Sequence, residues 1–287
     1  MSDKEKQSGF KYGYLIVIPM LMLAGSVGYL VYGYSQTGEW FLRSIDLKGG
    51  TLINVPTADS VDILALESEL SAAYGDLSVR EIRRLSGYGI LIQAGADADA
   101  DAILLDLDNR GIPTDHASVE TIGPSLGESF WYQAQVGIMI SFVLMGIIVF
   151  LIFRTVAPSV AVILAGVSDI IVTLALMQVF QIELTLPGLA AILMLIGYSI
   201  DTDILLTTRT IRTGEGTFMQ RVKSAFKTGI TMSLTTMAVL TVLLLSSISP
   251  VLSQIATVLL IGLLIDLVNT WIQNTSILGW YVKRKGI

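Results

Sequence analysis

The sequence contains no cysteine and only one histidine, His116. The lack of cysteine excludes disulfide bonds and thiolate metal sites. His116 lies outside the long apolar runs, so histidine cannot serve as a catalytic base or a metal ligand within them. No P-loop motif is present, which argues against ATP hydrolysis by this chain. Charge is scarce as well, because only 15% of the residues are Asp, Glu, Lys or Arg, whereas soluble domains carry about 25%.

The sequence is instead rich in long apolar runs. Of the 287 residues 53% are hydrophobic, and the mean hydropathy is +0.69. A helix needs about 20 apolar residues to cross the hydrocarbon core of a bilayer. The first run is too long for a signal peptide and is followed by no A-x-A cleavage site. Six runs therefore predict an integral membrane protein with six transmembrane helices, at 12–34, 132–153, 158–180, 187–208, 228–247 and 252–272.

The basic residues predict the orientation of these spans. If the six spans alternate in direction, 12 of the 18 Lys and Arg residues lie on one side of the membrane, on short loops and tails. The other side receives the long segment 35–130 and two loops without a basic residue. Short cytoplasmic loops are enriched in Lys and Arg. We therefore expect both termini in the cytoplasm and residues 35–130 outside, in the cytoplasmic (cell) membrane.

The segment 35–130 reads as a compact domain between the first two spans. It has 16 acids and 6 bases, a net charge of −10, which is typical of a well-solvated surface and does not determine a fold. Residues 44–55 predict a strand bent at Gly49 and Gly50, and residues 58–75 predict a helix. Two strands within 77–95, a second helix within 97–111 and a last strand within 115–127 complete the order β-α-β-β-α-β. This order is typical of the ferredoxin-like α+β fold.

The sequence thus predicts three parts: 1–34 as the cytoplasmic tail and first transmembrane helix, 35–130 as the extracytoplasmic domain, and 131–287 as the remaining five helices and a cytoplasmic tail. The run DADADA at 97–102 suggests a calcium loop, but it lacks the glycine and the final glutamate of an EF-hand. Acidic residues at a helix N-terminus are favoured by the helix dipole. We therefore interpret this run as the start of the second helix.

Four acidic residues interrupt the apolar runs. They are Asp169 in the third span, Asp201 and Asp203 in the fourth, and Asp266 in the sixth. A carboxylate at the middle of a bilayer costs about 2.5–3.5 kcal/mol, so these side chains must face a protein interior or water, or be protonated. Either solution suits the movement of protons. Asp201 and Asp203 point about 200° apart on a helix, so they cannot face the same partner.

Small and basic residues near the acids suggest partners for them. Gly197 and Ser199 precede Asp201 and Asp203 by one turn, where small residues let another helix approach closely. Lys227 stands at the edge of the fifth span and could extend inward to serve as a counter-ion, or it could simply follow the positive-inside rule. The hydroxyls behind it, Thr235 among them, could line a polar groove or bond to the backbone.

Enzymatic alternatives fit less well. Intramembrane serine chemistry requires a histidine in the membrane. An aspartyl intramembrane protease would need two aspartates sharing a proton, and Asp169 with Asp201 is the pair that could serve, but neither flank contains a GxGD pattern. The DTD sequence at 201–203 would lie in hydrocarbon, which excludes a nucleotide-sugar site. We therefore expect no enzymatic activity, no metal and no cofactor.

Several motifs along the chain occur together in one known family. They are IDLKGGT at 45–51, TIGPSLG at 121–127, GYSIDTDILLTTR at 197–209 and KTGITMSLTT at 227–236. With six spans and one large domain after the first span, this order resembles the archaeal SecF branch of the SecD/SecF protein-export family, within the RND superfamily. The residues that carry the resemblance are Gly49, Gly50, Thr51, Gly123, Pro124, Gly197, Ser199 and Thr235.

The resemblance implies a role in export. SecF pairs with SecD, each forming half of an RND-type unit, and the pair assists the SecYEG channel. The bacterial pair is thought to use the proton gradient to draw unfolded polypeptide outward, through an acid on the fourth span and a base at the start of the fifth. Membrane lipid would surround the spans, and no nucleic-acid partner is expected.

The motif of the fourth span differs from its bacterial counterpart. Bacterial members read GYSINDT, which places their acid column on Thr202, between Asp201 and Asp203, and their base column on Lys227. The expected ion relay therefore comprises Asp201, Asp203, Lys227 and Asp169, and either of the first two acids could titrate, with proton or sodium. Two other hypotheses remain: half of an RND-type exporter of lipids or small molecules, and a purely structural role in which the acids form interhelical hydrogen bonds.

Overall fold

The computed structural model describes residues 13–75, 77–84, 87–212, 216–246 and 249–286. The chain forms two compact units. The helical unit comprises Met1–Leu42, Val136–Glu183 and Pro187–Ile287, and the sheet unit comprises Arg43–Gln135 and Leu184–Leu186.

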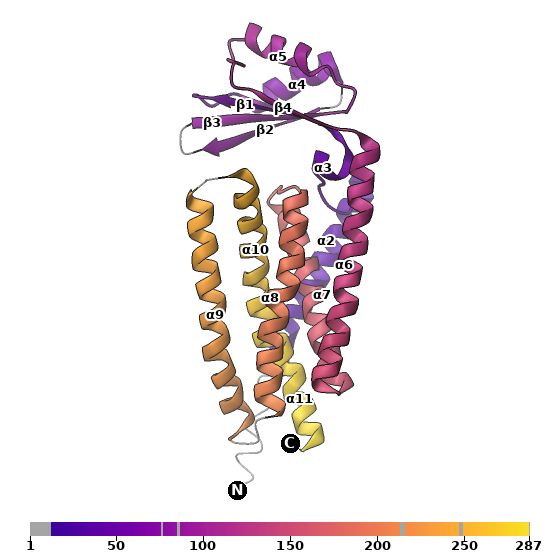
Figure 1. The fold of residues 1–287 in the computed structure, drawn as a ribbon, viewed down its shortest axis with the longest axis vertical. Helices are drawn as coiled ribbons and strands as arrows, with labels where there is room; N and C mark the ends of the chain where they lie inside the picture. The colour runs from indigo at the N-terminus through magenta and orange to yellow at the C-terminus, as the bar shows by residue number, and fades with distance from the viewer. Residues whose placement is uncertain (1–12, 76, 85–86, 213–215, 247–248, 287) are drawn as a thin grey trace. The chain divides into compact units, whose positions relative to one another are not determined.

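The sheet unit contains one four-stranded antiparallel sheet (Figure 1). Its strand order is β2-β3-β1-β4, and both helices α4 and α5 lie on the same face of the sheet. The elements are β1 (Gly50–Thr57), α4 (Ile63–Tyr74), β2 (Leu77–Arg84), β3 (Gly87–Ala94), α5 (Ala100–Asn109) and β4 (Ser118–Ile122). The predicted β-α-β-β-α-β ferredoxin-like fold is therefore confirmed.

The core of the sheet unit follows from the period of its strands and helices. Alternate residues of β1 and β3 point to the same face, and Ile53, Val55, Ile90 and Ile92 are all completely buried. The helices cover this face with residues at helical spacing, which are Leu66, Leu70, Ile103 and Leu107. These apolar side chains form one continuous cluster between the sheet and the two helices.

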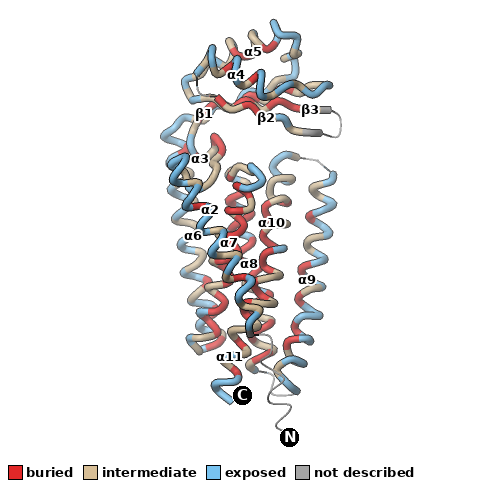
Figure 2. The backbone as a smooth tube through the Cα atoms, turned by 180° about the vertical axis from the view of Figure 1, so that it is seen from behind, coloured by how far each residue is buried: buried red, intermediate tan, exposed pale blue. Residues whose placement is uncertain are grey.

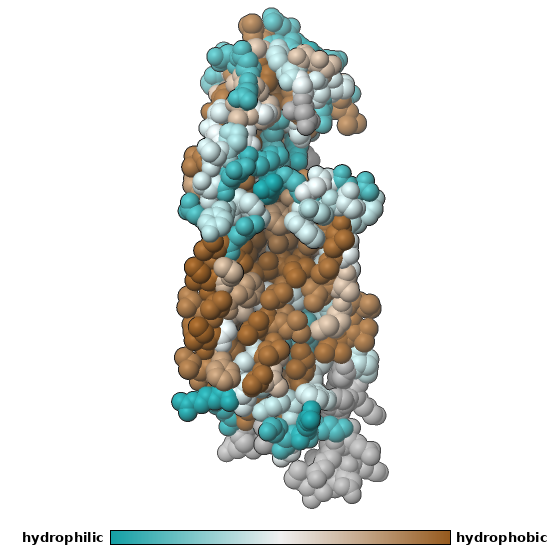
Figure 3. Space-filling model, turned by 90° about the vertical axis from the view of Figure 1, so that its right-hand side faces the viewer, coloured by the Kyte–Doolittle hydropathy of each residue, from teal (hydrophilic) through white to brown (hydrophobic). Residues whose placement is uncertain are grey.

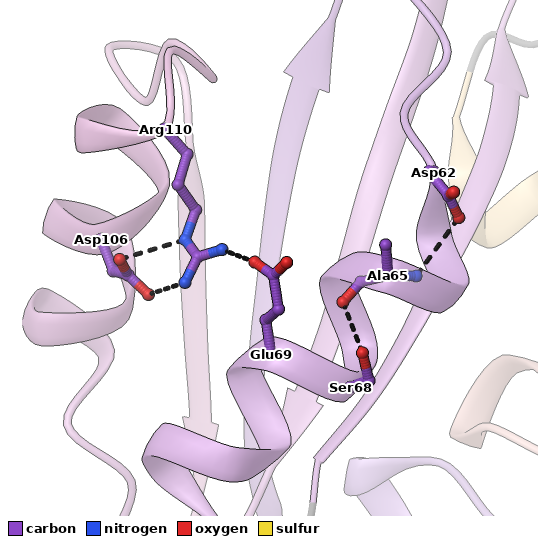
Figure 4. A network of polar contacts seen from close by, with 6 residues as sticks. All are labelled: Asp62, Ala65, Ser68, Glu69, Asp106 and Arg110. Carbon is purple, nitrogen blue, oxygen red and sulfur yellow. Dashed lines mark hydrogen bonds and ion pairs between the residues drawn. The ribbon is translucent and has the colours of Figure 1, made fainter.

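Aspartates begin both helices of the sheet unit. Asp62 accepts a hydrogen bond from Ala65 N at 3.2 Å and so caps α4, as Figure 4 shows. Asp99 accepts one from Ala102 N at 3.1 Å and caps α5. A cap of this kind satisfies one of the free N–H groups of the first turn. The interpretation of DADADA as a helix start is thus confirmed.

Arg110 connects the two helices at their outer surface. It donates to both carboxylate oxygens of Asp106, on α5, at 3.1 Å, and it also bonds to Glu69 on α4 (Figure 4). Hydrogen bonds with these two carboxylates raise the pKa of Arg110. The guanidinium therefore remains charged and holds α4 against α5.

The prediction of a bent strand over 44–55 is wrong in its first half. Ile45–Lys48 form a short helix, α3, and the strand begins only at Gly50. Ile45 and Leu47 are both buried. Apolar residues two positions apart resemble the alternation of a strand, but here both belong to one helical turn that packs against the interior of the unit. Gly49 and Gly50 have positive φ angles of 81° and 140°, which side chains disfavour, and they turn the chain from helix to strand.

Among the residues that the structure describes, six helices are long and apolar enough to cross a membrane. The six spans are Tyr14–Thr37, Pro124–Phe153, Val156–Val179, Leu186–Ile211, Phe218–Ser246 and Pro250–Lys285. They correspond to α2 (Val17–Thr37, preceded by the 3-10 turn Gly13–Ile16), α6 (Pro124–Phe153), α7 (Val156–Val179), α8 (Leu186–Ile211), α9 (Phe218–Ser246), and α10 (Pro250–Val268) with its continuation. The six predicted spans are confirmed, although the sixth is longer than expected.

Burial differs among these helices. Buried residues are concentrated on α7, α8 and α10, whereas α6 and α9 are mostly exposed or half-buried (Figure 2). Figure 3 shows hydrophobic side chains covering the lateral face of the helices on the side that it displays. An apolar lateral surface around a partly polar interior is the arrangement that a bilayer requires.

Candidate functional site

Three of the four acidic residues in the spans lie inside the helical unit. Asp169 on α7 is 1% exposed, and Asp203 on α8 and Asp266 on α10 are completely buried. Within the described part of the chain, none of these carboxyl groups pairs with a lysine or an arginine. Buried charges are normally paired, so this cluster must obtain its compensation from hydrogen bonds and from protons or other cations.

Asp169 is held by neighbours from two other helical segments. The Ser199 hydroxyl on α8 donates to its Oδ2 at 2.6 Å, and Asn269 Nδ2 donates to its Oδ1 at 2.7 Å. Asn269 also donates to Ser168 at 3.1 Å. Both oxygens of the Asp169 carboxyl are therefore occupied, and its position is fixed between α7, α8 and the segment after α10.

Thr270 joins the other two acids. Its hydroxyl oxygen lies 2.9 Å from Asp203 Oδ1 and 3.0 Å from Asp266 Oδ1. A threonine hydroxyl has only one hydrogen to donate, so it can donate to one of these carboxyls at a time. The other carboxyl receives no hydrogen from Thr270, so it must carry a proton or accept a hydrogen from another group. The geometry therefore links the protonation states of Asp203 and Asp266.

Further contacts make the cluster one network. Thr202 Oγ1 lies 2.9 Å from the Ser199 carbonyl oxygen and 3.2 Å from Asp266 Oδ2, and Asn274 Nδ2 donates to Asp203 Oδ1 at 2.5 Å. Because the Ser199 hydroxyl in turn donates to Asp169, Thr202 links Asp266 to the residue that holds Asp169. Three acids on three helices are thus connected through hydroxyls and carboxamides, an arrangement that can accept, hold and pass on protons.

A π-helical segment supplies most of the neutral partners. The segment η2 (Asn269–Asn274) continues α10 and leads into α11 (Thr275–Lys285). Four of its six residues, Asn269, Thr270, Gln273 and Asn274, are completely buried. π-Helical turns within α-helices occur frequently at functional sites. Sequence reasoning named Asp266 as a deep acid but left it out of the site, and it ended the sixth span at Ile272, inside this segment.

The structure divides the predicted relay residues into two groups. Asp169 and Asp203 belong to the buried network, together with Ser199. Asp201 and Gly197 lie instead on an exposed face of α8, and a Cβ added to Gly197 would meet nothing within 4 Å. Lys227 is exposed on α9, and within the described residues no hydrogen bond or ion pair joins it to the three buried acids.

The hydroxyls of α9 bond mainly to their own helix. Thr231, Thr235, Thr236 and Thr241 each donate to the carbonyl four residues earlier, at 2.6–3.2 Å. The sequence predicted that these hydroxyls line a polar groove or bond to the backbone, and the structure shows the bonds to the backbone. Thr235 therefore has a local partner, the carbonyl of Thr231.

The two glycine motifs of the sheet unit pack against each other. A Cβ on Gly49 would lie 2.6 Å from Pro124 Cα, and a Cβ on Gly127 would overlap the backbone of Gly49 and Lys48. Thr51 and Thr121 share a hydrogen bond of 3.1 Å between β1 and β4. IDLKGGT and TIGPSLG thus form one contact in which the backbones touch and side chains have no room.

Among the residues that the structure describes, no group of three or more His, Cys, Asp or Glu side chains could hold a metal ion.

Comparisons with known proteins identify the family. Residues 107–284 match the family described as protein export membrane protein SecD/SecF, C-terminal. A protein-export membrane protein SecF from Methanothermobacter thermautotrophicus is 43% identical over 248 residues, which cover 84% of each chain. SecF from Pyrococcus furiosus is 36% identical over 274 residues, covering 95% of this chain and 92% of the other. These relatives do not favour the alternative of an exporter of lipids or small molecules.

A solved structure has the same fold. The crystal structure of SecDF, a translocon-associated membrane protein from Thermus thermophilus, matches with a TM-score of 0.75 at 20% sequence identity. The match covers 96% of this chain but only 38% of the SecDF chain. Together with the sequence matches, it shows that this multi-pass membrane protein belongs to the SecF branch of the SecD/SecF family of protein-export membrane proteins.

Proposed function

We propose that the chain is a non-enzymatic subunit that couples a proton gradient to the export of polypeptides, and that the buried network of Asp169, Asp203 and Asp266 carries the proton. The observation that supports this most directly is the connection of three buried acids by hydroxyl and carboxamide groups without a basic partner in the described residues. A purely structural role would not require three groups that each cost about 2.5–3.5 kcal/mol in a bilayer.

Asp203 is the better candidate for the proton site of the fourth span. It is completely buried and bonds to Thr270 and Asn274, whereas Asp201 is exposed on the opposite side of the same helix. A group that moves a proton must be connected to other groups that accept it, and Asp203 meets this condition. In this proposal Asp201 and Lys227 act from exposed surfaces and do not belong to the buried relay.

The exposed face of α8 is evidence for a partner protein of similar architecture. Leu193, Met194, Gly197, Tyr198 and Asp201 are all exposed there, although they lie within a span. Small residues on such a face allow two helices to approach closely. The chain matches only 38% of the SecDF chain, so a SecD-like second half is the partner that we propose for this face. The pair would act with the SecYEG channel and with the unfolded polypeptide that leaves it.

The distribution of basic residues supports a membrane orientation. We propose that both termini are cytoplasmic and that residues 35–130 form an extracytoplasmic domain between the first span and the five spans within 131–287. Of the 18 Lys and Arg residues, 12 lie on the side assigned to the cytoplasm, in agreement with the positive-inside rule. The sheet unit would then be the part that meets the emerging polypeptide.

Replacement of the two acids of the fourth span tests the coupling. Asp203→Asn and Asp201→Asn, singly and together, would be expressed with the SecD-like partner in cells that lack their own copy. Secretion of a reporter would be followed with the proton gradient intact and collapsed. We expect Asp203→Asn to remove the part of secretion that depends on the gradient. We expect Asp201→Asn to keep that dependence and to weaken co-purification of the partner.

Membrane abundance of each variant serves as the control for folding. If the double variant secretes normally and still responds to collapse of the gradient, the proton role of these acids is refuted. If instead secretion falls equally with and without a gradient, the acids act only as structural hydrogen-bond groups.

A further inference from the structure

Some polar atoms of the buried network have no partner. In the part of the chain that the structure describes, Asp203 Oδ2, Asn274 Oδ1 and both amide atoms of Gln273 are buried without a hydrogen bond. All three residues are completely buried. More than nine in ten buried polar groups have a partner, so each exception requires an explanation. These atoms mark the part of the network that lacks hydrogen-bond partners.

Two of the unpartnered atoms belong to side chains that touch each other. Asn274 Nδ2 donates to Asp203 Oδ1 at 2.5 Å. The unpartnered Asn274 Oδ1 belongs to the same carboxamide as the bonded Nδ2. The unpartnered Asp203 Oδ2 belongs to the same carboxyl group as the bonded Oδ1. Both free atoms are acceptors when the carboxyl is ionised, so neither can satisfy the other. If Asp203 Oδ2 carries a hydrogen, it becomes a donor, and Asn274 Oδ1 is the unpartnered acceptor on the side chain that already contacts Asp203.

We propose that Asp203 and Asn274 together form a proton-binding site. A proton taken up by the carboxylate at Oδ2 makes a neutral acid, and its O–H donates to Asn274 Oδ1 while Asn274 N–H continues to donate to Asp203 Oδ1. The two groups are then joined by two parallel hydrogen bonds, and release of the proton as H⁺ removes one of them. This inference rests on the proposed function and adds to it the side chain that receives the hydrogen bond from the bound proton.

The π-helical geometry of η2 explains how Asn274 reaches this position. In a π-helix hydrogen bonds join residues five apart, so such residues share a face. Asn269 and Asn274 are five apart, and each donates to a different buried acid, Asp169 and Asp203 respectively. An ordinary α-helix would place them about 140° apart. The π-helical segment therefore directs both carboxamides towards the acids.

The other titratable groups around Asp203 are acids. Asp266 faces it through Thr270, and Asp169 is held by Ser199 and Asn269, while no lysine or arginine among the described residues pairs with any of the three. When Asp203 is ionised, it competes with Asp266 for the single hydroxyl hydrogen of Thr270. When Asp203 is protonated, that hydrogen becomes free for Asp266. Occupancy of the proton site on α8 is in this way transmitted to α10.

Infrared difference spectroscopy of the purified full-length protein tests this site. The C=O stretch of protonated Asp203 is identified as the band that Asp203→Asn removes. We expect Asn274→Leu to shift this band to higher wavenumber, because the acid loses both the Asn274 N–H that donates to its Oδ1 and the acceptor of its O–H. Asn269→Leu is the matched control, since this carboxamide bonds to Asp169 instead, and it should leave the Asp203 band in place. If the leucine variant does not fold, Asn274→Ala tests the same contact without additional volume.

Each outcome either supports or refutes the proposed proton-binding site. A shift with the Asn274 variants and none with Asn269→Leu supports the site. An unchanged band in the Asn274 variants, no Asp203 band at any accessible pH, or a band that responds to Na⁺ and not to pH overturns it. The measurement does not involve export, so the two proposals fail separately. A site confirmed by infrared with normal secretion of Asp203→Asn would refute the coupling alone.

Discussion

The contact between the two glycine motifs can be tested by a set of four alanine substitutions. Gly49→Ala imposes two costs, because Gly49 has a φ of 81° and its Cβ would lie 2.6 Å from Pro124 Cα and 2.8 Å from Pro124 N. This combination, φ of 81° with ψ of 162°, is adopted almost only by glycine and costs another residue at least about 1–2 kcal/mol. Overlap with a backbone that cannot rotate away costs about 1–3 kcal/mol. We therefore expect Gly49→Ala to destabilise the sheet unit by about 2–5 kcal/mol.

The other three substitutions separate these costs. Gly75 has a φ of 88° with nothing within 4 Å of a Cβ, so Gly75→Ala carries the conformational cost alone, about 1–2 kcal/mol. Gly127 has no positive φ, but its Cβ would overlap the backbone of Gly49 and Lys48, so Gly127→Ala carries the steric cost alone, about 1–3 kcal/mol. Gly123→Ala carries neither cost, because space is open around it, and should change little.

Amide hydrogen exchange of the full-length protein in lipid nanodiscs measures these differences. Protection of the β1 amides reports the free energy of opening of the sheet, and it should fall most in Gly49→Ala. Equal protection in Gly49→Ala and Gly75→Ala would show that the contact with Pro124 contributes nothing. A loss in Gly123→Ala as large as that in Gly49→Ala would refute the assignment of the motif to backbone packing.

Two further substitutions test the local structure of each unit. Asp99→Ala removes the cap of α5 and should destabilise that helix by about 0.5–2 kcal/mol, seen as faster amide exchange in its first turn, whereas Asp97→Ala, which removes no cap bond, should have no such effect. In the helical unit, a Cβ on Gly229 would overlap the ring of Trp271 in η2, so Gly229→Ala should cost about 1–3 kcal/mol and lower the thermal unfolding midpoint in detergent. Gly137→Ala, with open space around it, is the control, and an equal midpoint for the two variants would contradict the packing of α9 on η2.

Local signals were sufficient to predict most of the architecture. Apolar runs of about 20 residues predicted the six spans, because a bilayer requires that length wherever the helix lies. Alternation, helical spacing and acidic helix starts predicted the ferredoxin-like unit, since each of these patterns reports burial within one element. Local patterns also led to the error at α3, where the buried Ile45 and Leu47, two residues apart, have the spacing of a strand but belong to one helical turn.

The sequence by itself determined that acidic residues lie at membrane depth and that Asp201 and Asp203 cannot share a face, because the helical period fixes their relative direction. Only the tertiary structure decided which of them faces inward, since the packing of α7 and α10 selects the face of α8 that is buried. It also brought Asp266, Thr270 and Asn274 to the same interior, through a π-helical continuation of a span that sequence reasoning had ended early. Hydrogen bonds in this network join residues up to 101 positions apart, so they depend on how the helices pack, and the sequence of any one helix does not determine them.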